Sequence, residues 1–475
     1  MTSAGEDLRE ELRSVLGPQG LITAAAEVAP YLSDHRRLYQ GAARAVALPR
    51  SVAEVARVVA LCDARGVGVV PHGGNTGYCG GATPDDSGSQ LVIALSRLNR
   101  IRSVEPANDS LTAEAGCTLA QVQAAAAAAE RFFPLSLGSE GTCQLGGNLS
   151  TNAGGTSVLR YGMARDLVLG LEVVLADGRV LELLSALRKD NTGYDVKSLF
   201  LGAEGTLGII TAASVKLFPM VRERATALIA VTDVQAAVAL LSRVRSTSSD
   251  RVSSFELLPR AALELTLRHI PGTIDPLGSP YPWYVLCELS GSAAGEALQG
   301  VLQECLAAAL ADGSILDAAV VNSERERAAL WRIRGSVPEA QRREGAGLKH
   351  DIALPVGRLA DFMSATLPWV RQHVPEGLLV AYGHVGDGNL HFNFSAVDAA
   401  AAPRLLRRTE EVRRAIHDLV AEYGGSFSAE HGIGALKVDE LERYTSPVEL
   451  SLMRAIKHAL DPNNTMNPGK VLRRA

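Results

Sequence analysis

The sequence predicts an α+β protein with two domains and a helical C-terminal segment. Its 475 residues exceed what one hydrophobic core ordinarily serves. Residues 91–219 carry mostly strand patterns interrupted by glycine-rich loops, whereas residues 220–430 alternate strands with amphipathic helices. We place the first domain at residues 1–219, the second at 220–430 and the helical segment at 431–475.

Composition and charge exclude several classes of protein. The chain is 47% hydrophobic and 21% charged, with a formal net charge of −5. It has no basic run that would favour nucleic acid or an anionic membrane surface as a partner. The six cysteines form no C-x-x-C pair, which is typical of reduced thiols. Since the acidic N-terminus lacks a signal-peptide pattern and no run of about 18 apolar residues occurs, we expect a cytoplasmic protein without a membrane span.

The beginning of the first domain has a clear order of elements. Residues 1–36 have the pattern of helices, and the segment up to "PHGGNTG" predicts strand, helix, strand and glycine loop. Ser51 is expected to cap the helix, with Glu54 as its capping-box partner. The buried face of this helix follows from the i, i+3, i+4, i+7 spacing of Val55, Val58, Val59 and Cys62.

Strand patterns dominate the rest of the first domain. They occur at "LVIAL", "LTAEAG", "LVLGLEVVL" and "LGIITAASVKLFP", and "ADGR" at 176–179 predicts a hairpin turn. In the second domain "ATALIAV" and "WYVLCEL" predict strands, and residues 234–246 and 295–311 predict amphipathic helices.

Glycine-rich loops are the strongest functional signal of the first domain. They lie at 71–81, 137–155 and 201–211, with Ser, Thr and Asn between the glycines of the first two. Glycines let the backbone approach a ligand, and successive N–H groups can then bind phosphate oxygens. No loop matches G-x-G-x-x-G or the G-K-[ST] of a P-loop. The loops therefore predict a large diphosphate-bearing ligand, but not through the nicotinamide or ATPase fingerprint.

Six segments together resemble one family of flavoproteins. They are "PHGGNTG", "GGNLSTNAGG", "KDNTGYDVKSLFLGAEGTLGIIT", "GHVGDGNLH", "AEHGIG" and "MNPGK". These segments resemble the vanillyl-alcohol-oxidase (PCMH-type) flavoproteins, and within them the FAD-dependent D-2-hydroxyacid dehydrogenases. The resemblance implies a two-part FAD-binding domain, PCMH-type over about 37–219, a substrate (cap) domain at 220–430 that carries a metal site, and a tail at 431–475 that returns to the FAD domain.

The loops and the resemblance together give the expected cofactor residues. FAD is expected to be bound non-covalently, with a covalent link through His72 as the alternative. The residues expected to bind it are Pro71, Gly73, Gly74, Asn75, Thr76, Gly77, Gly138, Ser139, Gly141, Thr142, Gly146, Gly147, Asn148, Ser150, Thr151, Asn152, Gly154, Glu204, Gly208, Ile209 and Asn467.

The segment "AYGHVGDGNLHFNF" predicts a pair of histidines. If Asp387-Gly388 is a two-residue hairpin turn, His384 faces His391 across the strands on one side of the hairpin. Asn393 then shares their face, while Val385, Leu390 and Phe392 take the other face. Two close imidazoles favour a divalent metal, and "SAEHGIG" offers Glu430 beside His431 as a further ligand.

The resemblance implies a role for each of these residues. His384, His391 and Glu430 would bind the metal, and His431 would be the catalytic base. Zinc is the first choice, with manganese or cobalt as alternatives. The metal would bind the substrate hydroxyl and a carboxylate oxygen, His431 would remove the hydroxyl proton, and Asn393 would orient the substrate.

Two cations point to the substrate. The resemblance to D-2-hydroxyglutarate dehydrogenases implies that Arg334, on an expected helix, and Lys349, at an expected strand start, bind the distal carboxylate. The pattern departs from that group at Pro338, where a hydroxyl residue is expected; Ser336 stands nearby. As the expected substrate, D-2-hydroxyglutarate therefore ranks first, D-malate or a broader set of D-2-hydroxyacids second, and D-lactate third.

Other interpretations of the sequence remain open. One is an oxidase of the same fold that uses O₂ directly, and another is a FAD-binding module without redox activity and with a structural metal. For a dehydrogenase we expect an electron-transfer flavoprotein or a quinone as acceptor, and a homodimer as the assembly.

Overall fold

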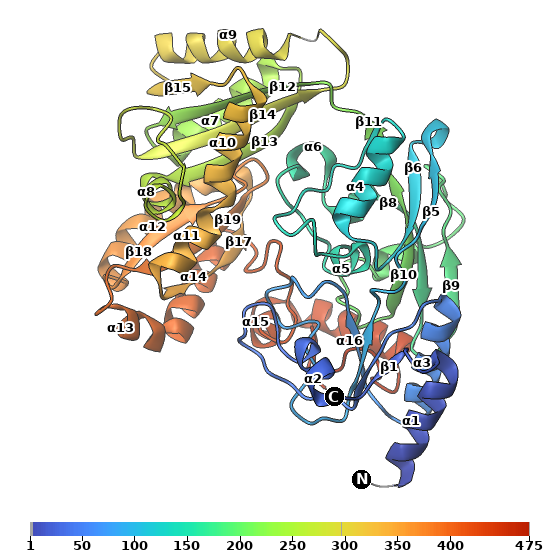
Figure 1. Cartoon of the computed structure of the whole chain (residues 1–475). Helices are drawn as coiled ribbons and strands as arrows, with labels where there is room; N and C mark the ends of the chain where they lie inside the picture. Colours follow the sequence, from blue (N-terminus) through green and yellow to red (C-terminus); the bar gives the residue numbers. More distant parts are fainter. Residues whose placement is uncertain (1–2, 296, 475) are drawn as a thin grey trace. The chain divides into compact units, whose positions relative to one another are not determined.

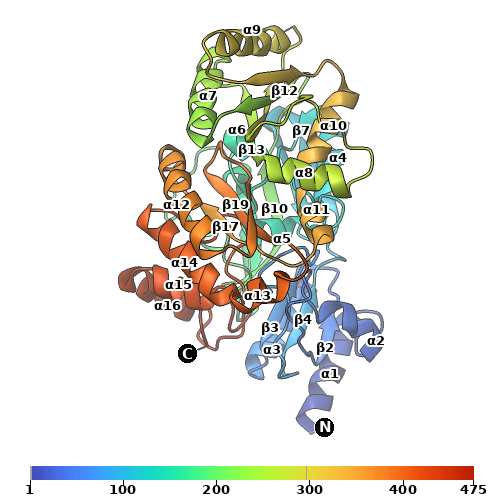
Figure 2. The same cartoon turned by 90° about the vertical axis from the view of Figure 1, so that its left-hand side faces the viewer.

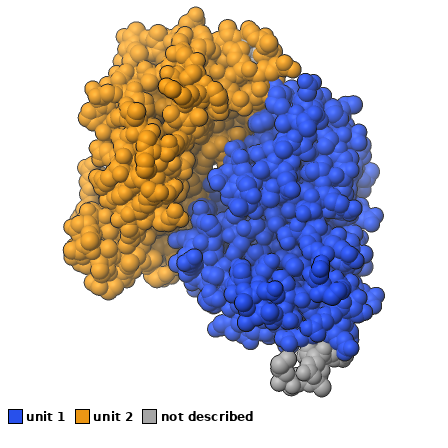
Figure 3. All heavy atoms as spheres, in the orientation of Figure 1, with its two compact units in different colours: residues 1–154, 162–220, 430–475 blue, residues 155–161, 221–429 orange. Residues whose placement is uncertain are grey.

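The computed structural model describes residues 3–295 and 297–474. Within this range, residues 3–7 are described by their backbone alone. The chain forms two compact units, coloured separately in Figure 3. Unit 1 consists of residues 1–154, 162–220 and 430–475, and unit 2 of residues 155–161 and 221–429. Helices and sheets are mixed in both units, which confirms the α+β class (Figure 1). None of the described helices is long and apolar enough to cross a membrane.

The first sheet of unit 1 carries the predicted strand, helix and glycine loop. Its strand order is β1-β2-β4-β3, with β2 and β3 both parallel to β4. The helices α1 and α3 contribute apolar side chains to the core beneath it, including the predicted face of α3. The bounds are α1 Ser3–Leu16, β1 Leu21–Ile22, α2 Ala25–Val28, β2 Ala45–Ala47, α3 Val52–Ala64, β3 Val69–His72 and β4 Leu91–Ala94. The strand β1 was not expected among the helices predicted for residues 1–36.

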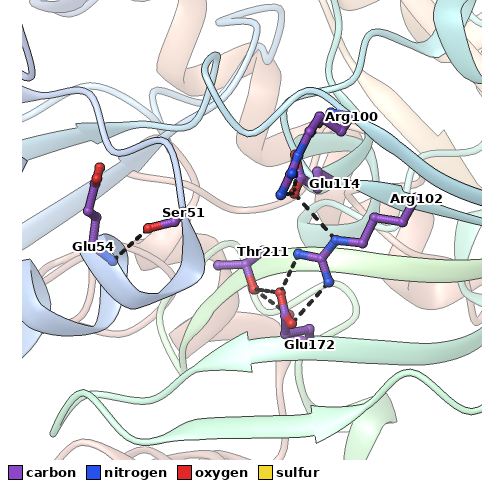
Figure 4. A network of polar contacts seen from close by, with 7 residues as sticks. All are labelled: Ser51, Glu54, Arg100, Arg102, Glu114, Glu172 and Thr211. Atoms are coloured by element: carbon purple, nitrogen blue, oxygen red, sulfur yellow. Dashed lines mark hydrogen bonds and ion pairs between the residues drawn. The ribbon is translucent and has the colours of Figure 1, made fainter.

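The start of α3 differs in one detail from the predicted capping box. The Ser51 side chain accepts the N–H of Glu54 at 3.2 Å, as expected of an N-cap (Figure 4). The Glu54 carboxylate, however, accepts the N–H of Arg50 and not that of Ser51. The reciprocal bond is therefore shifted by one residue, because Glu54 also pairs with the Arg50 guanidinium at 3.0 Å.

The second sheet of unit 1 is antiparallel, with strand order β5-β6-β10-β8-β9. The predicted turn is confirmed between β8 and β9, where Val174 pairs with Val180. The elements are β5 Ile101–Glu105, β6 Ser110–Glu114, α4 Leu119–Ala128, β7 Arg131–Phe132, α5 Leu145–Ser150, β8 Val168–Val174, β9 Val180–Leu183, β10 Ile209–Lys216 and β11 Phe218–Pro219, which pairs with β7. Helices α15 Val438–Tyr444 and α16 Pro447–Leu460 complete the unit.

The main sheet of unit 2 has strand order β13-β14-β12-β15 and is covered by helices on both faces. Helices α7 and α9 share a core with one face, whereas α8, α10 and α11 pack on the other (Figure 1). The bounds are α6 Val158–Tyr161, β12 Glu223–Val231, α7 Val234–Thr247, β13 Val252–Pro259, α8 Arg260–His269, β14 Trp283–Gly291, α9 Leu298–Ala311, β15 Asp317–Val320, α10 Glu324–Gly335 and α11 Val337–Glu344.

A smaller sheet of unit 2 is built around β19, which pairs with β16 and β17 along one edge and with β18 along the other. Helices α12 and α14 place apolar side chains in the same core as Phe392 and Phe394 (Figure 2). The bounds are β16 Gly347–Leu348, β17 Asp351–Ala353, α12 Leu359–His373, β18 Gly377–Tyr382, β19 Asn389–Ala396, α13 Ala402–Arg407 and α14 Thr409–Glu422. Short 3₁₀ turns are η1 Ala29–Tyr31, η2 Pro106–Asn108, η3 Ala164–Leu167, η4 Val196–Leu199 and η5 Val356–Arg358.

The predicted two-residue hairpin at Asp387-Gly388 is wrong. His391 pairs with Tyr382 and not with His384, so the register is shifted by two residues. The chain leaves β18 at Gly383, whose backbone pairs with Leu257 of β13 through two hydrogen bonds of 2.8 and 3.0 Å. A shift of two residues keeps each side chain on its face. Leu390 and Phe392 are therefore buried in the apolar core as predicted, together with Val385 of the loop.

A network of ion pairs around two buried carboxylates, Glu114 and Glu172, crosses the antiparallel sheet of unit 1 (Figure 4). Arg102 of β5 binds both oxygens of Glu172 of β8, at 2.9 and 3.1 Å, and Thr211 of β10 donates to Glu172 at 2.8 Å. Glu114 of β6 accepts from Arg102 and from Arg100. Burial raises the pKa of the Glu114 carboxyl, but the arginines outweigh burial and hold it below its usual range. The network therefore ties these strands together.

This network predicts that Glu172→Gln lowers the free energy of unfolding by about 2 kcal/mol. The substitution removes a charged bidentate pair and leaves Arg102 with Glu114 as its one remaining carboxylate partner in the network. Urea unfolding followed by circular dichroism measures the change. The control is Arg50→Ala, which removes an ion pair whose arginine is 68% exposed and should cost less than about 1 kcal/mol. Equal losses in the two variants would contradict the structural role of the network.

Candidate functional site

The three predicted glycine loops meet within unit 1. The N–H of Glu204 donates to the carbonyl of Ser150 at 2.8 Å, which joins the third loop to the second. A side chain at Gly205 would lie 2.9 Å from Pro71, and one at Gly73 would lie 3.7 Å from the Gln144 side chain. The first loop therefore touches both of the others.

The tail of the chain joins the same place. The N–H of Asn467 donates to Val69 of β3 at 2.8 Å. The Asn467 side-chain amide donates to the carbonyls of Gly81 and Glu204 at 2.9 and 2.8 Å. The predicted return of "MNPGK" to the glycine loops is thus found within unit 1.

In each of these four segments, a predicted cofactor residue other than glycine has a left-handed backbone. The φ angles are 52° at Asn75, 50° at Asn152, 51° at Glu204 and 41° at Asn467. Such conformations cost free energy in residues with side chains, and they gather where N–H groups must turn toward a ligand. All four were predicted to bind the cofactor.

The loops fit a bound cofactor by two further observations. The space in front of the backbone is open within 4 Å at Gly77, Gly138, Gly141 and Gly147. In the part of the chain that the structure describes, the buried oxygens Asn467 Oδ1 and Gln144 Oε1 have no hydrogen-bond partner. Buried polar atoms are normally satisfied, so a ligand that donates hydrogen bonds explains them. Gln144 was not predicted.

Other predicted cofactor residues have internal roles as well. Asn148 donates to the Cys143 sulfur, the Thr151 hydroxyl donates to Gly147, and Asn152 accepts the N–H of Arg165. Two lie at the start of β10. A side chain at Gly208 would lie 2.7 Å from Val173, and Ile209 is buried in the core. A ligand contact at Gly208 or Ile209 would therefore have to be made by the backbone, because neither position offers a side chain to the surface. The remaining members lie on the first two loops: Gly74, Thr76, Ser139, Thr142, Gly146 and Gly154.

His431 lies beside the first glycine loop in unit 1. Its ring centroid is 4.6 Å from that of Tyr78, which lies within this loop. The backbone after His431 is anchored at several points. Glu204 accepts the N–H groups of Ile433 and Gly434 at 2.7 and 2.8 Å, and Cys79 accepts the N–H of Ala435 at 2.8 Å. The predicted base is thus held next to the predicted cofactor loops.

Two residues predicted for the metal or substrate lie together in unit 2. The rings of His384 and His391 are 5.7 Å apart between centroids and nearly perpendicular. His384 Nδ1 lies 2.7 Å from Glu256 Oε1, and His391 Nδ1 lies 3.7 Å from Asp351 Oδ1. Each histidine therefore has a buried carboxylate near Nδ1, and Arg334 Nη2 lies 3.4 Å from the other ring nitrogen of His384. A carboxylate at Nδ1 is the usual partner of a histidine that binds a metal through Nε2. Neither carboxylate was predicted.

A possible metal-ligand group stands where the chain leaves unit 2. Ala429, the last residue of unit 2, donates its N–H to the carbonyl of Asp351 at 3.2 Å, and Glu430 and His431 follow directly in the chain. Asp351 and His391 offer a carboxylate and an imidazole within unit 2, and Glu430 and His431 offer the same two kinds of ligand atom at the start of the last segment of unit 1. Nitrogen and oxygen donors of this kind suit zinc, manganese or cobalt. His391 and Glu430 were predicted as ligands, and His431 was predicted as the base. Asp351 was not predicted, and the predicted ligand His384 is not part of this group.

The predicted substrate residues also lie in unit 2. Arg334, buried on α10, donates to Glu256 at 2.8 Å and stands over the ring of Tyr382 at 5.0 Å. Lys349 is exposed and lies between β16 and β17, not at the start of a strand. The Asn393 amide accepts the N–H of His350 at 3.1 Å and donates to Gln341 at 3.0 Å, so it supports the backbone next to Lys349.

Pro338 has a structural explanation. It lies in the first turn of α11, where a helix has no use for the backbone N–H that proline lacks.

Family profiles match most of the chain. The FAD binding domain profile matches residues 43–184, and the profile of FAD linked oxidases, C-terminal domain, matches residues 220–471.

Curated relatives match it over nearly its whole length. The mitochondrial D-2-hydroxyglutarate dehydrogenase of Bos taurus is 38% identical over 461 residues, covering 96% of this chain and 81% of that protein. The D-2-hydroxyglutarate dehydrogenase of Xanthomonas citri pv. viticola is 35% identical, covering 95% and 94%. A D-2-hydroxyglutarate–pyruvate transhydrogenase of Saccharomyces cerevisiae is 32% identical, covering 97% and 93%.

Two solved structures share the fold. p-Cresol methylhydroxylase aligns with a TM-score of 0.76 at 17% identity, over 100% of this chain and 98% of that one. Alkyldihydroxyacetonephosphate synthase aligns with a TM-score of 0.76 at 18% identity, over 97% and 84%. Both belong to the fold that the glycine loops predicted.

The Glu204 carboxylate holds the backbone after His431 through the N–H groups of Ile433 and Gly434, and we call this pair of bonds the clamp. We predict that Glu204→Gln increases amide hydrogen exchange over residues 432–435 about tenfold. The reason is that one of two charge-assisted bonds to the backbone is lost. Exchange followed by mass spectrometry on that peptide measures the change. In the control Glu54→Gln, the affected bond is to Arg50 at the start of α3, so residues 432–435 should be unchanged. Protection of residues 432–435 equal to the parent protein in Glu204→Gln would refute the clamp.

Proposed function

The chain belongs to the FAD-linked oxidases, and we propose that it is a FAD-dependent dehydrogenase that oxidises D-2-hydroxyglutarate to 2-oxoglutarate. The observation that carries the proposal is the position of His431, 4.6 Å from Tyr78 in the first glycine loop. A proton acceptor thus stands at the edge of the loops that would hold FAD. The relatives that are 35% and 38% identical support the choice of substrate.

FAD would be held by the three glycine loops and the tail. Backbone N–H groups of the loops would bind the diphosphate, and Asn467 Oδ1 and Gln144 Oε1 would accept hydrogen bonds from the cofactor. His72 is buried with its ring against Tyr31, which supports non-covalent binding. When bound, the flavin supplies a hydride acceptor.

His431 would act as the base of the reaction. Its imidazole takes the proton from the C2 hydroxyl of the substrate, and imidazole suits this role near pH 7. The clamp and the bond from the Ala435 N–H to Cys79 keep the ring beside Tyr78. A base held in one place lowers the entropic cost of reaching the transition state.

A divalent metal, zinc first, would be bound by His384, His391 and Glu430. Asp351 would orient His391 through Nδ1 or complete the ligand set. When bound, such an ion supplies a Lewis acid for the substrate hydroxyl and carboxylate. Manganese and cobalt remain the alternatives.

The distal carboxylate of the substrate would be met by Lys349, with Arg334 beside it. Lys349 is exposed, and the neighbouring backbone is held by Asn393. Pro338 supplies no hydroxyl to bind the distal carboxylate, so other substrates stay as alternatives. D-malate or a broader set of D-2-hydroxyacids ranks second and D-lactate third.

The electron acceptor, the assembly and the location stay predictions. An electron-transfer flavoprotein or a quinone is expected as acceptor, and O₂ would make the protein an oxidase. The yeast relative is named for transfer to pyruvate, which adds a 2-oxoacid to the acceptors to be tested. A homodimer and a cytoplasmic location are also still to be tested; the relative from Bos taurus is named mitochondrial.

We expect the purified protein to be yellow and to be bleached by D-2-hydroxyglutarate without air. His431→Ala should keep the flavin absorbance but reduce the rate of anaerobic flavin reduction at least about 100-fold, because general-base catalysis contributes that much. Stopped-flow absorbance measures both. Retention of the parent rate in the variant would rule out His431 as the base, and a colourless parent protein would rule out the flavin.

Lys349→Ala should raise the KM for D-2-hydroxyglutarate about 10- to 100-fold and leave D-lactate turnover nearly unchanged, because D-lactate has no distal carboxylate. Steady-state kinetics with both acids measure the difference. Lys189, which lies in an exposed segment of unit 1, gives the control Lys189→Ala. Equal losses with the two acids would remove Lys349 from substrate recognition.

A further inference from the structure

A single buried carboxylate joins the predicted metal and substrate residues of unit 2. Glu256, 1% exposed, binds Arg334 Nε through Oε2 at 2.8 Å and His384 Nδ1 through Oε1 at 2.7 Å. We infer that Glu256 is a positioning residue that sets both the metal-binding nitrogen of His384 and the orientation of Arg334. This inference rests on the proposed function.

The fold explains how Glu256 reaches both partners. It lies in β13, between Phe255 and Leu257, which point into the core on the opposite face. Leu257 pairs with Gly383, and the N–H of Gly386 donates to Phe255 at 3.2 Å. The backbone of β13 thus runs alongside the loop that carries His384. The register change at Gly383 is what brings this histidine to Glu256.

Two neighbours of His384 indicate the same tautomer. A carboxylate accepts hydrogen bonds, so Nδ1 must carry the proton that points at Glu256. Arg334 Nη2 lies 3.4 Å from His384 Nε2, and a guanidinium can only donate. Nε2 therefore carries a lone pair, which faces Arg334 in this structure and which a metal would take over in its place. An imidazole that donates to a carboxylate is also a more basic ligand.

The Glu256 carboxylate also fixes the orientation of the Arg334 guanidinium. Its Nε is fixed by Glu256, and its guanidinium lies over Tyr382, whose ring centroid is 5.0 Å from that of His391. The Glu256 carboxylate thus lies between Arg334 and His384, with one oxygen on each.

The same helix supplies a matched pair without a histidine. Arg327, seven residues before Arg334 on α10, binds Glu288 of β14 at 3.2 Å, and Trp331 donates to Glu288 at 2.8 Å. Glu288 is also buried, at 7% exposed, and lies on the strand next to β13. A purely structural role for buried Arg–Glu pairs predicts similar effects at Glu256 and Glu288. A positioning role predicts effects on metal and substrate at Glu256 alone.

The test compares Glu256→Gln with Glu288→Gln in the full-length, FAD-loaded protein. Zn²⁺ affinity is measured by competition with a chromophoric chelator, and KM and kcat are measured with D-2-hydroxyglutarate and D-lactate. We expect Glu256→Gln to lower Zn²⁺ affinity 10- to 100-fold, the usual cost of losing such a partner, and to raise KM for D-2-hydroxyglutarate. In Glu288→Gln, Zn²⁺ affinity and KM should stay within about twofold of the parent protein, since that pair touches no histidine.

A third variant separates the effect of the negative charge at position 256 from the effect of the side-chain length. Glu256→Asp keeps the charge but is one methylene shorter and cannot span both partners, so its Zn²⁺ affinity should lie between those of the parent and Glu256→Gln. It also carries the test if Glu256→Gln fails to fold, which flavin content and the midpoint of thermal unfolding reveal. Zn²⁺ affinity equal to the parent in a folded Glu256 variant, or equal losses at Glu256 and Glu288, would overturn the inference. A parent protein that binds no Zn²⁺ and is not bleached by D-2-hydroxyglutarate would overturn the proposed function itself, and the inference with it.

Discussion

A carboxylate taken out of water must meet donors or positive charge, and this constraint organises both units of the protein. In unit 1, Glu172 and Glu114 are compensated by Arg102 and Arg100, which ties four strands together (Figure 4). Burial raises the pKa of the Glu204 carboxyl, and the N–H groups of residues 433 and 434, together with the charges of Lys437 and Lys470, compensate it in part. The compensation of Glu204 is therefore what fixes the loop that carries His431.

The glycine loops were predictable because their signal is local. Phosphate binding needs glycine and small polar residues in short runs, and these are visible in the sequence. Gln144 lies within such a run but has no distinguishing pattern, and only its buried oxygen without a partner reveals it. The left-handed backbone at Asn75 and Asn152 agrees with the preference of asparagine for that conformation, whereas Glu204 has no such preference.

The histidine pair was predicted for a reason that the structure corrects. Asp387-Gly388 is a strong turn signal, but Gly383 turns the chain away from β18 five residues before Gly388 and pairs with Leu257. Pairing between strands far apart in sequence cannot be read from turn chemistry. His384 therefore lies beyond the end of β18, and its ring centroid is still 5.7 Å from that of His391. Glu256 was missed for a related reason: one charged residue in "VSSFELLP" leaves the apolar pattern of a strand intact, although a buried glutamate is rare without a partner.

The compensation of Glu256 has a consequence for the choice of substrate. Arg334 is buried and already paired with a carboxylate, so little of its charge is left for a second one. Its five donors remain directional, however, and its Nη groups can still bond an anion that arrives with its own counter-charge. Lys349 is exposed and, in the proposed function, would supply that counter-charge. Preference for a dicarboxylate over a monocarboxylate should then come mainly from Lys349, with Arg334 setting the angle of approach. Such a division would account for a proline at position 338: the first turn of α11 accommodates it, and the substrate end of the proposed site would depend on the two cations and not on a hydroxyl there.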